Sequence, residues 1–245
     1  PARTCHAERI QHIAFGIRTG FAHRTLGTRD DDRLIEVAQH MIQQCGSISQ
    51  RVGAVRNDET VIIAIAPMTN LGRIVTERPD LAAKCRLFSM AGSIEKNFRD
   101  APGKIAEYNV AIDAPASQKV FAADWKSHAI TPLDHCGNIV MDGAPYQQLL
   151  HSERTIPREI IQTYRAWQKF CRNDDNPDLA SSILYDTVAV FLATDGHGVN
   201  FTDMTLSVND QGYLQNTHYG KHVRVAMGWD DKSAYMRNLA GILMR

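Results

Sequence analysis

The stretch Thr60-Val-Ile-Ile-Ala-Ile-Ala-Pro-Met-Thr-Asn70 joins an apolar run to a loop that carries a proline and two oxygen-bearing side chains. Residues 61–65 are all apolar and show no polar alternation, which predicts a central strand of a parallel sheet with helices on both faces. Loops at the carboxyl ends of such strands line ligand sites, so we expect the loop that follows to border a crevice. An ordinary strand-to-helix connection capped by Thr69 or Asn70 also explains the stretch taken alone.

The composition is that of a soluble globular domain, with 44% hydrophobic and 22% charged residues in a chain of 245. We expect one domain over residues 1–245. The 27 basic and 27 acidic residues cancel, and they form no long run of one sign. This balance argues against nucleic acid or an anionic membrane surface as a partner and favours a small-molecule ligand.

The five cysteines are odd in number and widely scattered, so we expect reduced, mostly buried thiols: Cys5, Cys45, Cys85, Cys136 and Cys171. No apolar stretch reaches the length of a membrane span, and no signal-peptide core opens the chain, so we expect a cytoplasmic protein. The chain begins at Pro1 rather than Met, and we expect an N-terminal segment to be missing.

Strand and helix patterns alternate along the chain, which predicts an α/β fold with an open, mostly parallel sheet flanked by helices. A clear amphipathic helix spans 30–45, where Asp30 to Asp32 sit as helix-capping residues. Further strands are predicted at 85–90, 129–133, 204–208 and 223–227, the last two antiparallel; further helices are predicted at 70–77, 115–123, 142–150, 157–171, 181–192 and 232–243.

Oxygen-rich side chains recur at predicted strand ends and helix starts: Thr69-Asn70, Glu107-x-Asn109, Asp134 and Asp186. Hard oxygen ligands of this kind suit Ca²⁺ or the hydroxyls of a sugar, whereas Zn²⁺ would require clustered histidines or cysteines. Single acidic residues in loops are also common as helix caps, so each position alone is unspecific.

Four short motifs occur in order along the chain: Ala66-Pro-Met-Thr-Asn70, Met90-Ala-Gly-Ser93, Ala106-Glu-Tyr-Asn-Val110 with Asp113 after it, and Leu184-Tyr-Asp-Thr-Val-Ala-Val190. Together they resemble the inosine-uridine preferring nucleoside hydrolase family. The first resembles that family's Gly-Pro-Leu-Thr-Asn loop, and the second resembles its Met-Gly-Gly-Ala turn. The third resembles Ala-Glu-Phe-Asn-Ile followed by Asp-Pro, and the fourth resembles the His-Asp-Pro-x-Ala-Val helix start. The resemblance covers about residues 30 to 245 and implies a Rossmann-like core that hydrolyses ribonucleosides.

The resemblance implies that a Ca²⁺ ion is bound by the backbone carbonyl of Thr69 and the carboxylate of Asp186. Such an ion orients a water molecule and lowers its pKa, while a carboxylate takes the proton of that water. The resemblance also implies a homo-oligomer, either a dimer or a tetramer.

The same resemblance assigns the substrate contacts. Glu107 and Asn109 would bind the ribose hydroxyls of a small-molecule nucleoside, and Met90 would lie near the sugar. Asn97 is a candidate for a further asparagine of the family, although the loop is longer here. Tyr185 stands where many members keep a histidine that protonates the leaving base, and it could donate a proton or stack on that base.

One family feature, an Asp-x-Asp-x-x-x-Asp-Asp loop with most calcium ligands and the general base, has no counterpart in the sequence. Nothing between Pro1 and Arg29 matches it, and the Asp30 to Asp32 run has the wrong context. We therefore expect either an N-terminally truncated chain that lacks the first strand or a degenerate relative. The alternatives are a non-catalytic nucleoside- or sugar-binding protein on the same scaffold, and an unrelated α/β domain whose motifs are caps and turns.

Overall fold

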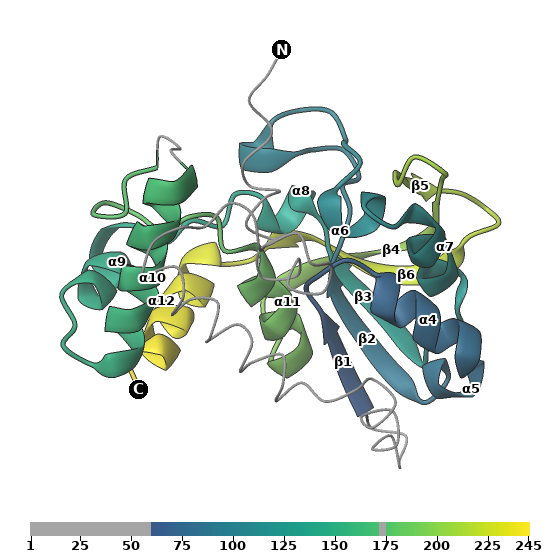
Figure 1. Ribbon diagram of the computed structural model, residues 1–245, viewed down its shortest axis with the longest axis horizontal. Coiled ribbons are helices and arrows are strands. Elements are labelled where there is room, and N and C mark those ends of the chain that lie inside the picture. Colours follow the sequence, from purple (N-terminus) through teal and green to yellow (C-terminus); the bar gives the residue numbers. More distant parts are fainter. Residues whose placement is uncertain (1–59, 172–174) are drawn as a thin grey trace, which may run out of the picture.

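A six-stranded mixed sheet in the order β1-β2-β3-β6-β4-β5 carries the part of the chain that the structure describes (Figure 1). This structure is a computed structural model, and it describes residues 60–171 and 175–245. The predicted helix at 30–45, its three aspartates and two of the cysteines lie outside these residues. The strands are β1 (Thr60–Ala64), β2 (Cys85–Met90), β3 (Ser127–Thr131), β4 (Val199–Val208), β5 (Leu214–Asn216) and β6 (Lys221–Trp229).

Helices connect and cover these strands. They are α4 (Thr69–Glu77), α5 (Pro79–Ala82), the 3₁₀ turn η2 (Phe98–Asp100), α6 (Tyr108–Ala111), α7 (Ala114–Ala122), α8 (Leu133–Cys136), α9 (Gly143–Leu150), α10 (Thr155–Cys171), α11 (Tyr185–Thr194) and α12 (Lys232–Leu243). Among the described elements, α9, α10 and α12 gather beside the sheet on the side of α11 (Figure 1). The predicted order of strands and helices is confirmed, although α11 begins at Tyr185 rather than near residue 181.

The sheet is mostly parallel, as predicted. β1, β2, β3 and β6 pair in parallel, and β4 pairs antiparallel with both β6 and β5. Parallel strands place their carboxyl ends at one edge of the sheet. The loops after β1, β2 and β3 therefore lie at the same end of the molecule, where ligands bind in folds of this kind.

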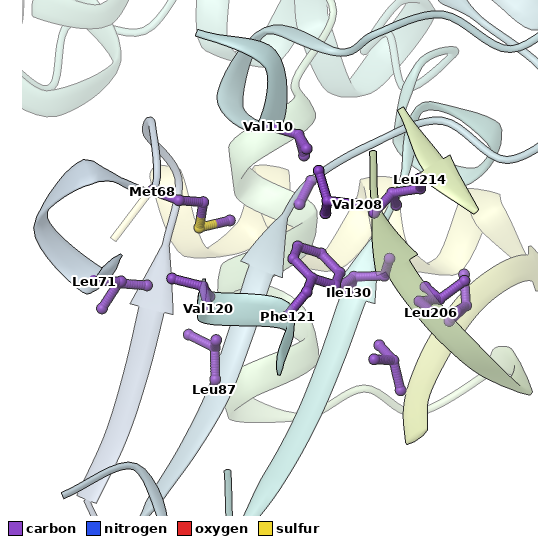
Figure 2. Packing of buried hydrophobic residues seen from close by; sticks show 13 residues of the cluster. Met68, Leu71, Leu87, Val110, Val120, Phe121, Ile130, Leu206, Val208 and Leu214 are labelled. Atoms are coloured by element: carbon purple, nitrogen blue, oxygen red, sulfur yellow. The ribbon is translucent and has the colours of Figure 1, made fainter. Parts of the chain in front are cut away.

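Both faces of the sheet are packed, because successive side chains of a strand point to opposite faces. Leu87 and Ile130 belong to the core beneath α4 and α7, where Figure 2 shows Val120 and Phe121 lying over the strands. Their neighbours Phe88 and Ala129 point the other way and form a smaller cluster with Leu192 of α11. Burial of this apolar surface is the main force that holds the two helical layers on the sheet.

Strand β1 is less covered among the described residues than we predicted. We predicted a central strand covered on both faces, and within the described residues β1 pairs only with β2 and is the last strand of the order. Ile62 and Ala64 pack against the core under α4, whereas Val61 and Ile63 are 41% and 38% exposed. An unbroken apolar run identifies a strand but does not fix its place in the sheet.

Two of the predicted buried thiols, Cys85 and Cys136, are buried and unpaired in the described structure, as expected. Burial raises the pKa of both thiols, which keeps them protonated and unreactive. In the described ranges, no helix combines the length and the apolar character that crossing a membrane requires.

Candidate functional site

The carboxyl ends of β2 and β3, together with α6, α8 and the start of α11, meet at one end of the sheet (Figure 1). Two acidic side chains lie here, the buried Glu107 and the half-buried Asp186, close enough that the charge of Asp186 contributes to raising the pKa of Glu107. Residues that are 79 positions apart are therefore brought into one electrostatic environment. This end of the sheet is the candidate site.

Glu107 is held by the backbone around it. Its Oε2 accepts a hydrogen bond from the Gly92 amide at 2.9 Å, and its Oε1 accepts one from the Asn109 amide at 2.8 Å. Burial raises the pKa of Glu107 to about 7, and backbone hydrogen bonds limit the rise. Each carboxylate oxygen has a second lone pair, so Glu107 can also accept hydrogen bonds from a bound hydroxyl.

Gly92 is required at its position in the turn after β2. Its φ of +80° lies in the left-handed region, and a Cβ there would come within 2.1 Å of Cδ1 of Leu214. Its amide binds Glu107, while its carbonyl accepts a hydrogen bond from the Leu133 amide at 2.9 Å. The glycine thus allows the chain to pass close enough to connect the ends of β2 and β3 with α6.

Asn109 places an unpaired acceptor at this end of the sheet. The residue is fully buried, and its Nδ2 donates to the carbonyl oxygen of Met90 at 3.0 Å and to the Met90 Sδ at 3.3 Å. Its Oδ1 is buried and has no hydrogen-bond partner in the part of the chain that the structure describes. Buried polar atoms are rarely left unpaired, so a donor from a ligand or a water molecule is expected here.

Asp186 lies in the first turn of α11, where the helix dipole favours a negative charge. Burial raises its pKa to about 6, and no hydrogen bond from a described residue opposes that rise. A half-buried carboxylate without a donor is suited to a cation. However, no group of three or more His, Cys, Asp or Glu side chains that could hold a metal occurs within residues 60–171 and 175–245.

Thr69 follows β1 along the chain, and its side chain is already engaged within the fold. Its hydroxyl donates to Oδ2 of Asp113 at 2.6 Å, while Oδ1 of Asp113 caps α7 through the Ala116 amide. Thr69 is also the first residue of α4, so its carbonyl points along the helix toward the next turn. The predicted metal contact of this carbonyl stays a prediction. Residues 65–67 belong to neither β1 nor α4, so regular secondary structure leaves their carbonyls available.

Tyr185 lies directly before Asp186, and Asn97 lies in the long loop after β2. Burial raises the pKa of the Tyr185 phenol, and its ring meets the ring of Phe98 edge-on, with centroids 6.1 Å apart. The Nδ2 of Asn97 donates to the carbonyls of Pro102 and Gly103, at 3.4 and 2.9 Å, inside its own loop. Because its Nδ2 is engaged within the loop, the predicted contact of Asn97 with the substrate would be made through its side-chain amide oxygen.

Asp134, one of the oxygen-rich positions in the sequence, holds a loop. Its Oδ1 accepts hydrogen bonds from the amides of Glu95 and Lys96 at 2.7 and 2.9 Å, and its Oδ2 accepts one from Ile94 at 2.8 Å. A carboxylate that binds three amides has its charge well compensated. This side chain anchors the start of the loop between β2 and α6.

Phe98 was not singled out by the sequence patterns. Its side chain is 45% exposed and contacts Tyr185, so it borders the candidate site. The signal that could have found it is an aromatic residue within the otherwise polar stretch 95–104.

A groove lies along α10, away from the candidate site. It is open, has a volume of about 510 Å³ and is lined by Glu159, Ile160, Thr163, Tyr164, Trp167 and Ser182. The hydroxyl of Tyr164 is buried without a hydrogen-bond partner among the described residues. None of the predicted site residues lines this groove.

Comparison with known proteins identifies the family and the fold of the chain. The sequence model of the inosine-uridine preferring nucleoside hydrolase family matches residues 11–236. No curated protein matches the chain.

Solved structures with the same fold include a purine-preferring ribonucleoside hydrolase from Gardnerella vaginalis, with a TM-score of 0.66 and 17% identity over 81% of this chain and 66% of that one. The plant nucleoside hydrolase PpNRh1 has a TM-score of 0.62 and 18% identity, over 80% of this chain and 63% of that one. An inosine-uridine preferring nucleoside hydrolase from Bacillus anthracis has a TM-score of 0.55 and 16% identity, over 78% of this chain and 61% of that one. The chain thus covers less than two thirds of the length of these proteins. By the match of the family model to most of its length, the chain belongs to the inosine-uridine preferring nucleoside hydrolase family.

Proposed function

We propose that this chain hydrolyses the N-glycosidic bond of a ribonucleoside and releases ribose and the free base. The observation that carries the proposal is the gathering of Glu107, Asn109 and Asp186 at one end of the sheet, where two polar groups lack hydrogen-bond partners among the described residues. The Oδ1 of Asn109 needs a donor, and the carboxylate of Asp186 needs a cation or a donor. A ribose with its hydroxyls would supply the first.

Glu107 and Asn109 fit the role of ribose ligands. Cleavage of an N-glycosidic bond passes through a sugar with oxocarbenium character, so the site must hold the ring in one orientation while positive charge develops. Both side chains are buried and fixed by hydrogen bonds to backbone groups, at Gly92 and Met90 respectively. Such rigid acceptors can bind hydroxyls without reorganising during the reaction.

Asp186 would supply a carboxylate to a Ca²⁺ ion, and the carbonyl of Thr69 is its predicted partner. When bound, the ion would lower the pKa of a water molecule and help to orient it. Ca²⁺ takes six to eight oxygen ligands, and among the described residues no group of three or more His, Cys, Asp or Glu side chains that could hold a metal occurs. Asp186 is therefore assigned as one ligand of the ion.

Tyr185 fits a contact to the base better than proton donation to it. Burial raises the pKa of its phenol, so at neutral pH the hydroxyl is a weak acid. The ring is half-buried and already contacts Phe98, which makes it a flat surface next to Asp186. Leaving-group protonation would then fall to water or to another group.

The test is the release of ribose from inosine and from uridine by the full chain, measured as reducing sugar. We expect release in the presence of Ca²⁺, its loss after addition of a chelator, and its recovery when Ca²⁺ is added back. Asp186→Asn serves as the inactive control. An active protein that is indifferent to chelation and to Asp186→Asn would contradict the assigned chemistry.

A non-catalytic nucleoside- or sugar-binding protein is the second candidate. The observation in its favour is the buried Oδ1 of Asn109, which has no partner among the described residues and could accept a hydrogen bond from a sugar hydroxyl without any catalysis. Calorimetry separates the two functions, because a binding protein would bind ribose or inosine with a measurable heat and release no product. A cytoplasmic homo-oligomer, dimer or tetramer, stays a prediction for light scattering and cell fractionation to check.

A further inference from the structure

The loop between β2 and α6 stands above the end of the sheet that holds Glu107 and Asp186 (Figure 1). Its tip is the 3₁₀ turn η2, which begins with Phe98. The ring of Phe98 is 45% exposed. Single exposed apolar residues are common, but this one lies beside the candidate site, where the fold holds it in place.

The start and middle of the loop are tied down by side chains. Asp134 binds three consecutive amides, and the hydroxyl of Ser93 donates to the carbonyl of Lys96 at 2.6 Å and accepts from the Ile105 amide at 3.1 Å. The side chain of Asn97 closes the other side of the loop through the carbonyls of Pro102 and Gly103. The backbone on both sides of Phe98 is therefore fixed.

The tip of the loop is anchored as well, and in a costly conformation. Arg99 and Asp100 have φ values of 57° and 60°, which residues other than glycine rarely adopt. The amide of Arg99 donates to the carbonyl of Gly137 at 2.9 Å, and its guanidinium pairs with Asp175 at 2.7 Å. The carboxylate of Asp100 also accepts a hydrogen bond from Asn138. Backbone strain that several contacts maintain is typical of residues that position something.

The side chain so positioned is Phe98, and what it contacts is Tyr185. Their ring planes meet at 77°, so the two rings form a corner next to Asp186. A planar heterocycle can stack on one wall of such a corner while it presents its edge to the other. On the basis of the proposed function, we propose that Phe98 and Tyr185 form the binding corner for the nucleobase and that the anchored loop makes Phe98 a specificity-determining residue.

This corner is apolar, so it would bind purines and pyrimidines without reading their hydrogen-bonding edges. Stacking of a base on an aromatic ring is tolerant of base identity and scales with the overlapping area. The larger purine ring system therefore gains more from Phe98 than a pyrimidine does. The ribose contacts at Glu107 and Asn109 are made by other residues and stay unchanged when Phe98 is altered.

Steady-state kinetics of four full-length variants test the proposal. Phe98→Ala should raise KM for inosine about tenfold, raise KM for uridine less, and leave inhibition by free ribose unchanged. Phe98→Tyr keeps a flat ring and should stay near the wild-type KM, whereas Phe98→Leu keeps the apolar volume and should behave like alanine. Tyr219→Ala is the matched control, because Tyr219 is 69% exposed and meets His218 edge-on at the amino end of β6, away from the site.

The outcomes separate this proposal from the proposed function. A wild-type protein that hydrolyses nucleosides while Phe98→Ala keeps its KM for both substrates would overturn the aromatic corner alone. Equal weakening of ribose inhibition and of nucleoside binding, or a clear loss of thermal stability in Phe98→Ala, would show a structural role instead and overturn it too. A wild-type protein that neither binds nor cleaves inosine and uridine would remove the proposed function together with the corner that rests on it.

Discussion

Two carboxylates at the same end of the sheet, the buried Glu107 and the half-buried Asp186, differ in their hydrogen-bond donors. Glu107 accepts hydrogen bonds from two backbone amides through both of its oxygens, whereas Asp186 receives none from a described residue. Burial raises the pKa of both, to about 7 and about 6 respectively. The fold thus uses Glu107 as a structural group as well as a candidate ligand, whereas the described residues leave the carboxylate of Asp186 without a donor.

A third carboxylate, Asp134, extends the comparison to the purely structural case, because its oxygens accept three amides of one loop. A fourth, Glu77, is exposed and pairs only with Arg73 one helical turn away. These carboxylates differ in the number of backbone amides that donate hydrogen bonds to them. That number, and not the position in the fold, distinguishes a structural carboxylate from a candidate ligand.

The largest effect is expected at Asp186. Asp186→Asn should lower kcat/KM for inosine by about a thousandfold, the upper end of what loss of one essential electrostatic contact costs. It should leave stability at pH 8 unchanged or raise it by about 1–2 kcal/mol, because a half-buried charge without a donor is removed. Ribose release and thermal unfolding measure the two effects. A strongly destabilised variant would show that the fold itself relies on this charge.

Asp134→Ala should destabilise the protein by about 3–4 kcal/mol, since three amides of the loop lose their acceptor and only some of them can turn to water. Urea unfolding provides the measurement. Asp142→Ala is the control, because Asp142 precedes α9 and its side chain makes no hydrogen bond to the helix. Its change in the free energy of unfolding should be near zero. Equal effects of the two substitutions would refute the anchoring role of Asp134.

The raised pKa of Glu107 predicts that the stability of the fold depends on pH. Its folded pKa of about 7 lies above the ordinary 4.5, so the folded state favours the protonated form. The contribution is fully present below pH 4.5 and is lost as pH rises through 7, by about 3 kcal/mol. Asp186 acts in the same direction, over the range from 3.8 to about 6.

Glu107→Gln should therefore flatten the loss of stability between pH 4.5 and 7, the window set by the shifted pKa. Denaturant unfolding across this range, at constant ionic strength, provides the measurement. The glutamine can still accept one of the two backbone hydrogen bonds, so the variant should fold. A profile that keeps the wild-type slope would assign the pH dependence to other groups.

The smallest effect is expected at the exposed pair. Glu77→Ala should cost about 0.3–0.5 kcal/mol at low salt, because Arg73 and Glu77 are both well exposed on α4. The difference should vanish in 1 M salt, which screens surface charges. A larger cost that persists in salt would indicate packing by the side chain rather than charge.

The sequence predicted best where chemistry is local. Glu107 and Asn109 are two residues apart, and their hydrogen bond forms the start of α6, so the motif specifies its own geometry. Asp186 in the first turn of α11 follows from the helix start in the same way. In these cases a few neighbouring residues decide the conformation, because helix caps act within one turn.

Prediction failed or was silent where partners come from distant segments. Asp134 reads as a possible ligand, yet its three amide partners lie about 40 positions away and make it an anchor. The corner of Phe98 and Tyr185 depends on a loop folded back over the sheet. Such contacts depend on the packing of whole elements, which no local pattern encodes.

The sequence by itself determined the α/β class, the order of the elements and the residues that carry oxygen at the strand ends. It could do so because hydrophobic periodicity and capping act over a few residues. Only the tertiary structure decided which carboxylates are satisfied by the backbone and which remain open to a ligand. The physical reason is that the cost of a buried charge is set by the donors around it, and those donors come from segments far apart in the chain.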